Sequence, residues 1–238
     1  MVGAMTSSLA GAQPVPPGPR VADLQLRGRA GPLRTRVHWP PATGGPVVRP
    51  LLVVLAPTST DAWWATVAAQ TGVVVLAVSD TRVTRVADEA ALAEATTAVQ
   101  WAADHAHELH ADPGRLLVGG EGRGAWLAAA VTLEARDEGW PSVVRQLLVV
   151  TTTSDTVAGA AGLVRRLRRS SLAGVAPAIV VTIGDGPHEV DARRYASRLR
   201  GAGIGVDELH HDGPVAGVAD CLAPTLRRAL GGGSEGPA

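Results

Sequence analysis

Short apolar runs separated by amphipathic segments make up most of the chain. Continuous apolar runs of this length are typical of strands covered on both faces, and they predict strands at residues 51–55, 72–78, 143–150, 177–183 and 205–210. Apolar side chains that recur at three- and four-residue spacing predict amphipathic helices at residues 61–70, 86–107, 191–201 and 219–230. Strands that alternate with helices in this order predict an α/β fold with a mostly parallel central sheet and helices on both faces.

The two ends of the chain have a different pattern from its middle. Residues 21–38 hold two alternating stretches broken by Gly31-Pro32, which predicts an antiparallel hairpin at the edge of the sheet. Pro, Gly and Ser are frequent in residues 1–20 and again in residues 231–238. We therefore expect a disordered lead and a disordered tail around one domain of residues 21–230.

Composition excludes several classes of function. The 238 residues suit one α/β domain with a large core, and a net charge of zero argues against a nucleic-acid partner. All 22 basic residues are Arg, which we attribute to a GC-rich bacterial genome. Seven scattered His without Cys pairs predict no metal site, and no motif indicates a cofactor. A single Cys, no signal-peptide pattern and no run of membrane-spanning length predict a cytoplasmic protein without a membrane anchor.

Residues 112–130 combine three signals in one stretch, DPGRLLVGGEGRGAWLAAA. An apolar burst runs into a cluster of glycines, and an Ala-rich helical pattern follows, which predicts a strand, a sharp turn and a helix. The run Gly120-Glu121-Gly122-Arg123-Gly124 has the spacing of the nucleophile elbow G-x-S-x-G. In that motif a serine lies at the apex of a strained turn, and the outer glycines let the helix pass close to the strand. Here the apex residue is Gly122, which has no side-chain oxygen.

This stretch resembles the elbow of the hormone-sensitive-lipase-like (α/β-hydrolase-3) esterases, which usually reads DPxRIxVGGDSAGGxLAAAV. The resemblance implies the α/β-hydrolase fold and, for an intact member, carboxylic ester hydrolysis. In the family a cap segment separates the strand after the elbow helix from the next strand. Only residues 151–175 intervene here, so we expect a reduced cap.

The resemblance also locates the other catalytic positions. Alignment on Thr182 and Pro187 puts the catalytic acid at Gly186, and the final motif puts the catalytic base at Ala216. The His-Gly-Gly-Gly loop that helps to hold the oxyanion is replaced by residues 56–59, which read APTS, and proline has no N–H to donate. The positions of nucleophile, acid and base therefore carry no functional group.

We interpret the chain as a catalytically degenerate hydrolase, a pseudo-esterase, that binds a small molecule or a protein partner. The helix N-terminus at the elbow still offers amides to a small acyl or aromatic ligand, and some plant hormone receptors are altered members of the resembled family. A second copy of the chain or an active enzyme is the alternative partner. The candidate ligand-binding residues are Thr58, Ser59, Glu121, Gly122, Arg123, Asp185, His188 and His211.

A rewired enzyme is the alternative function: a weak carboxylesterase, or a lyase, isomerase or cyclase. Its acid–base groups would be Glu121, Asp185, His188 and His211, all expected near the C-terminal edge of the sheet. Simpler interpretations exist, in which Glu121 pairs with Arg123 across the turn and His188 is a solvated loop residue.

Other residues have both a structural and a functional interpretation. Cys221 fits a small buried hydrophobe better than a substitute nucleophile, because Asp220 rather than a cation lies beside it. The basic residues 165–169 fit the solvated face of a short helix, with a phosphate or acidic-partner patch as the alternative. The sequence leaves open whether the pocket above the elbow is open or filled by Trp126, Trp63 or Trp64.

Overall fold

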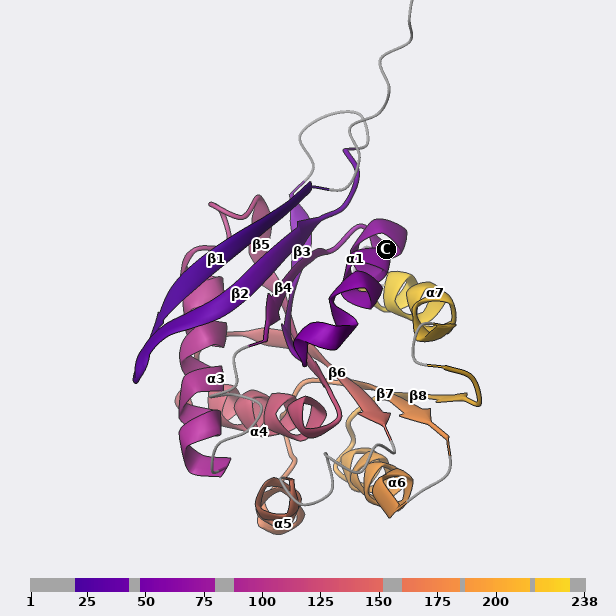
Figure 1. Ribbon diagram of the computed structural model, residues 1–238. Coiled ribbons are helices and arrows are strands. Elements are labelled where there is room, and N and C mark those ends of the chain that lie inside the picture. Colours follow the sequence, from indigo (N-terminus) through magenta and orange to yellow (C-terminus); the bar gives the residue numbers. More distant parts are fainter. Residues whose placement is uncertain are drawn as a thin grey trace, which may run out of the picture.

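Eight strands form one sheet in the described part of the chain, in the order β1-β2-β4-β3-β5-β6-β7-β8 (Figure 1). The computed structural model describes residues 20–42, 48–79, 88–151, 160–184, 187–214 and 217–231. The strands are β1 (Arg20–Gly28), β2 (Gly31–Trp39), β3 (Arg49–Leu55), β4 (Val74–Val78), β5 (Ala111–Glu121), β6 (Val143–Thr151), β7 (Ala178–Ile183) and β8 (Val206–His211). The helices are η1 (Thr58–Thr60), α1 (Asp61–Thr71), α3 (Asp88–Asp104), α4 (Arg123–Glu138), α5 (Ala161–Arg169), α6 (Pro187–Gly201) and α7 (Val218–Gly231).

The sheet is parallel except at one edge. The pairs from β4 through β8 are all parallel, whereas β2 is antiparallel to both β1 and β4. The predicted edge hairpin is confirmed, although Gly31-Pro32 opens β2 and the turn itself is Arg29-Ala30. Every residue of β4 is buried, as expected for an apolar strand with both faces covered.

Helices cover both faces of the sheet, as predicted. Successive side chains of a strand point to opposite faces. Leu51, Val53 and Leu55 of β3 therefore belong to the core cluster that includes α3, α4, α5 and α6, and Leu52 and Val54 belong to the cluster that includes α1 and α7. Figure 1 shows α1 beside α7 on one side of the sheet and the other helices on the opposite side.

Two helix boundaries differ by three or more residues from those expected. α3 ends at Asp104 rather than at residue 107, and hydrogen-bonded turns follow through residue 110. α6 begins at Pro187, four residues before the expected start. Proline favours the first position of a helix, because its φ is already helical and the N–H it lacks would have no partner there.

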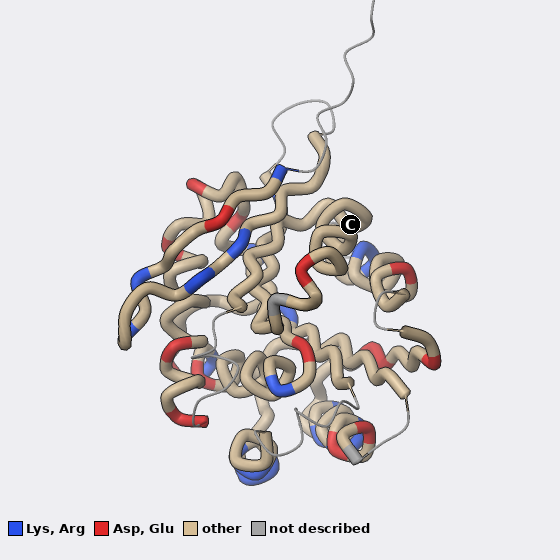
Figure 2. The backbone as a smooth tube through the Cα atoms, in the orientation of Figure 1, with Lys and Arg blue, Asp and Glu red and all other residues tan. Residues whose placement is uncertain are grey.

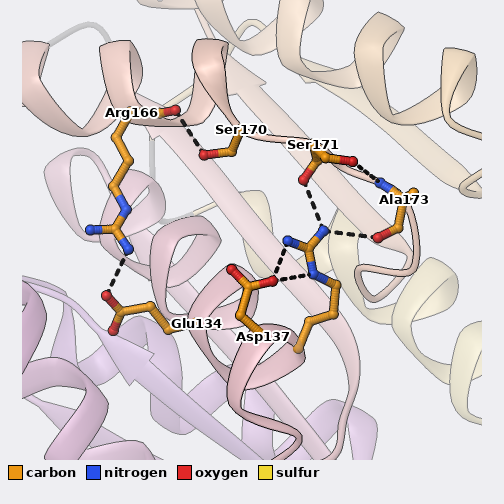
Figure 3. Close-up of polar contacts among 7 residues, drawn as sticks. Glu134, Asp137, Arg166, Ser170, Ser171 and Ala173 are labelled. Carbon is orange, nitrogen blue, oxygen red and sulfur yellow. Dashed lines mark hydrogen bonds and ion pairs between the residues drawn. The ribbon is translucent and has the colours of Figure 1, made fainter.

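α5 follows β6 where the resembled family has its cap, and polar contacts tie it to α4 (Figure 3). Arg166 of α5 pairs with Glu134 of α4 at 2.8 Å. Arg136 of α4 donates to the carbonyl oxygens of Ser171 and Ala173, at 2.8 Å each. The predicted short helix over the basic stretch 165–169 is confirmed by α5, which packs against α4.

The described helices are all too short or too polar to span a lipid bilayer. Residues 1–19 and 232–238 lie outside the described part of the chain, so the disordered lead and tail stay predictions.

Candidate functional site

The predicted strand, sharp turn and helix meet at Gly122. β5 ends at Glu121, α4 begins at Arg123, and Gly122 between them has φ 57° and ψ −117°. Its N–H donates to the carbonyl of Val149 at 2.8 Å, which ties the turn to β6. Residues that carry a side chain rarely adopt this backbone conformation. A glycine therefore forms the turn of a nucleophile elbow with less strain than a serine would.

The two outer glycines of the elbow allow the close approach that the motif requires. A Cβ at Gly120 would lie 2.1 Å from the carbonyl oxygen of Gly124, and a Cβ at Gly124 would lie 1.7 Å from that of Leu55. The first turn of α4 therefore passes against the backbone of both β5 and β3. Neither position has room for a larger residue.

Glu121 is a buried carboxyl beside the apex. Its side chain is 8% exposed, and its Oε2 has no hydrogen-bond partner among the described residues. Burial raises the pKa of Glu121 above its ordinary value of 4.5, although a hydrogen bond with the side chain of Thr60 acts in the opposite direction. Thr60 immediately precedes α1, so Glu121 lies near the start of that helix.

Replacing Glu121 with glutamine is expected to stabilise the protein at pH 7. Folding raises the pKa of this carboxyl. Its contribution to the stability of the folded state is therefore fully present at pH values below the unfolded pKa, and it is lost as the pH rises through the folded pKa. Glutamine keeps the contact with Thr60 and does not ionise, so the gain should shrink as pH falls toward 4.5. Urea unfolding at a series of pH values measures this. Glu138→Gln, at the exposed end of α4, is the matched control, and a loss of stability in Glu121→Gln at pH 7 would contradict the expectation.

Arg123 and Glu121 contact different residues, so the predicted ion pair between them across the turn is wrong. Arg123 is buried and pairs with Asp88 at the start of α3, with a distance of 3.0 Å between Nη2 and Oδ1. The Asp88 carboxylate also lies against α5, since a Cβ at Gly162 would be 2.0 Å from its Oδ2. The ends of α3, α4 and α5 therefore meet at Asp88.

The loop that replaces the oxyanion loop of the resembled family forms the turn η1. The N–H and the hydroxyl of Thr60 both bond to the carbonyl of Pro57, at 3.2 and 2.9 Å. Ser59 is exposed, and the side chain of Thr58 lies outside the description. Ser59 is therefore accessible to a ligand.

His188 is buried in the first turn of α6, so its interpretation as a solvated loop residue is wrong. Its exposed fraction is 6%, and neither ring nitrogen has a partner among the described side chains and backbone. The early start of α6 at Pro187 explains this position. Asp185, Gly186 and Ala216 lie outside the described residues, so their predicted roles stay predictions.

The two histidines at the end of β8 face opposite sides of the sheet. The Nε2 of His211 lies 3.0 Å from the carbonyl of Pro214. The Nδ1 of His210 lies 2.9 Å from the Thr182 hydroxyl, and its Nε2 lies 2.8 Å from Asp212. Sequence reasoning missed this pairing, because only the register of β7 and β8 places Thr182 opposite His210.

The order hydroxyl, imidazole and carboxylate is that of a nucleophile with its base. Thr182 is nevertheless only 7% exposed, and its hydroxyl also contacts the carbonyl of Leu209 at 3.4 Å. A substrate could not reach this oxygen without a rearrangement of the sheet edge. We therefore interpret the pairing as a cross-strand hydrogen bond that fixes His210.

Cys221 has the properties of a packing residue. Its thiol lies in α7, packs against the core on the α1 side and contacts the carbonyl of Val218 at 3.2 Å. Burial raises its pKa, with a smaller contribution from the charge of Asp220. A raised pKa lowers the thiolate fraction at neutral pH, which is the opposite of nucleophile activation.

The tryptophans belong to the packed helix layers. Trp63 and Trp64 of α1 meet edge to face, with ring centroids 3.7 Å apart, in the layer shared with α7. Trp126 of α4 is buried and meets Tyr195 of α6 with centroids 6.2 Å apart. The space that remains beside Trp126 is about 20 Å³, so its ring fills the junction of α4, α5 and α6.

Comparisons with known proteins agree with this fold. Residues 52–163 match the family described as the alpha/beta hydrolase fold. The esterase LipI of Mycobacterium tuberculosis is 29% identical over 84% of this chain and 74% of its own length. The carboxylic ester hydrolase LipN of the same organism is 32% identical over 80% of this chain, which spans 63% of LipN. The hyperthermophilic esterase of Pyrobaculum calidifontis has a TM-score of 0.74 at 22% identity, over 90% of this chain and 85% of that one.

Candidate metal ligands do not gather in the described ranges. No group of three or more His, Cys, Asp or Glu side chains is placed there to hold a metal ion.

Proposed function

We propose, on the premise that this chain has the α/β-hydrolase fold and has esterases as relatives, that it is a pseudo-esterase that binds a ligand and does not hydrolyse esters. The observation that carries the proposal is the residue at the elbow apex. Gly122 has the backbone conformation of an elbow and no side chain to attack a carbonyl.

The aligned positions of acid and base support the same proposal. Gly186 and Ala216 lack a group that could take a proton or orient an imidazole. Without nucleophile and base, an esterase retains only the contributions of substrate binding and the oxyanion loop. That loop is itself changed here, because Pro57 has no N–H to donate.

The described contacts favour binding over the rewired enzyme. Acid–base catalysis requires its groups within hydrogen-bonding reach of one substrate. Glu121 contacts Thr60, His211 contacts the carbonyl of Pro214, and His188 lies at the start of α6 without a partner among the described residues. No described hydrogen bond or ion pair joins any two of these three residues.

Ester hydrolysis is the direct test. We expect the full chain at high concentration to hydrolyse p-nitrophenyl acetate and butyrate no faster than its Cys221→Ala, Thr182→Val and His211→Ala variants do. A serine esterase assayed in parallel shows that the conditions support turnover. If the wild type hydrolyses these esters and one of the three substitutions abolishes that turnover, the proposed loss of hydrolysis is overturned. The substituted residue then identifies the relocated catalytic group.

Ligand binding is tested separately. We expect short acyl or aromatic acids to raise the melting temperature of the protein, because a ligand that binds only the folded state stabilises it. Size-exclusion chromatography tests the alternative of a second copy as the partner.

A further inference from the structure

A cavity of about 520 Å³ lies between α5 and the N-terminal part of α6. This volume is within the range of small-molecule sites in proteins, about 300–1,000 Å³. One face of α5 lines it with residues at helical spacing, and α6 contributes two residues one turn apart. Its lining includes Ala161, Val164, Arg165, Arg168, His188 and Asp191.

The two helices that form the cavity are fixed to each other near the C-terminal end of α5. Arg198 of α6 donates to the backbone carbonyls of Leu167 and of Ser170, the latter at 2.7 Å. The pair of Arg166 with Glu134 holds α5 onto α4 (Figure 3). The cavity is therefore bounded by anchored helices.

His188 is the polar group that this packing does not explain. It lines the cavity, it is 94% buried (6% exposed), and both ring nitrogens lack a partner among the described residues. A buried polar group without a hydrogen bond destabilises the folded state unless something else satisfies it. A ligand in the cavity would accept a hydrogen bond from the imidazole N–H.

The charges around the cavity favour an anion. Arg168 pairs with Asp191, which also lies 4.0 Å from Arg194, whereas Arg165 is exposed and forms no ion pair with a described residue. Among the lining residues, two arginines and one aspartate leave a surplus of one positive charge. Figure 2 shows the basic positions gathered along α5.

We propose that this cavity binds the carboxylate of a small organic acid, with Arg165 and His188 as donors and with Ala161 and Val164 against the apolar part of the molecule. The inference rests on the proposed function, because it takes ligand binding as the use of the fold and names the ligand class and its place. A monoanionic carboxylate matches the surplus of one positive charge, whereas a phosphate dianion would leave a negative charge beside Asp191.

Calorimetric titration of the full chain with benzoate and butyrate tests the ligand class, with benzamide and butyramide as neutral partners. We expect both acids to bind and both amides to bind at least about tenfold more weakly, because the amides lack the charge that Arg165 pairs with. Inorganic phosphate that binds more tightly than benzoate would overturn the choice of a carboxylate, and no binding of either acid would overturn the site.

Two substitutions locate the binding. Arg165→Gln is expected to weaken benzoate binding at least about tenfold. Arg169→Gln removes the same charge from an exposed position on the same helix that does not line the cavity, and affinity should stay within about twofold. Equal losses of benzoate affinity in the two variants would show that benzoate responds to the overall positive charge of α5 and would overturn the site.

His188→Leu separates a ligand-binding histidine from a structural one. Leucine removes the unsatisfied nitrogens, so the melting temperature should rise by about 2–8 °C while benzoate binding falls at least about tenfold. A variant that melts lower and binds benzoate normally would overturn the role of His188. The ester assay judges the proposed loss of hydrolysis independently of this site. A protein that binds no acid and hydrolyses no ester fails the ligand-binding proposals and leaves the loss of hydrolysis standing.

Discussion

Replacing Gly124 with alanine is expected to lower the free energy of unfolding by at least about 3 kcal/mol. The added Cβ would lie 1.7 Å from the carbonyl oxygen of Leu55 and 2.7 Å from its carbonyl carbon. Both atoms are backbone of β3, a strand buried on both faces, so no side chain can move aside. Relief requires α4 to move away from the sheet, which would separate the apolar surfaces that it buries.

Denaturant unfolding of Gly124→Ala measures this cost, and Gly201→Ala provides the comparison. Gly201 ends α6, and nothing lies within 4 Å of the position of its added Cβ. This control should change stability by less than about 1 kcal/mol. A Gly124→Ala protein as stable as the wild type would mean that α4 does not pass this close to β3.

The largest effect on activity is expected from restoring the triad. A protein with Gly122→Ser, Gly186→Asp and Ala216→His should hydrolyse p-nitrophenyl acetate at least about a hundredfold faster than the wild type, because a positioned base alone contributes about 10²–10⁴-fold. Serine at φ 57° is also expected to cost about 1–3 kcal/mol of stability.

Single substitutions separate the two effects of the triple change. Gly122→Ser should lose the same stability and gain no turnover, since it has a hydroxyl without a base. Gly122→Ala has the same backbone strain without the hydroxyl. A triple variant that folds and stays inactive would show that the acid or base position is misaligned, or that the site no longer admits an ester.

Local sequence signals predicted the elements that position the candidate site. The glycine spacing of residues 120–124 predicted the elbow, because only a strand and a helix in close contact require glycine at both outer positions. Apolar runs predicted β3 and β4, and alternation predicted the edge hairpin. These patterns arise from steric demands and burial, which act on neighbouring residues.

The partners of the polar residues could not be predicted in the same way. Asp88 and Arg123 are 35 residues apart, and their pairing depends on how α3 packs beside α4. Thr182 meets His210 only through the register of two strands. The burial of His188 did have a local signal, because Pro187 is a favourable first residue for a helix.

The elbow turn lies in the interior of the molecule, where β5, β6 and α4 meet. Most residues of α4 are buried, and the N–H of Gly122 is bonded to β6. Local opening begins where few apolar contacts hold the chain, so this turn should exchange its amide protons only when the whole domain unfolds. The elbow then keeps its shape during the local openings of the rest of the domain.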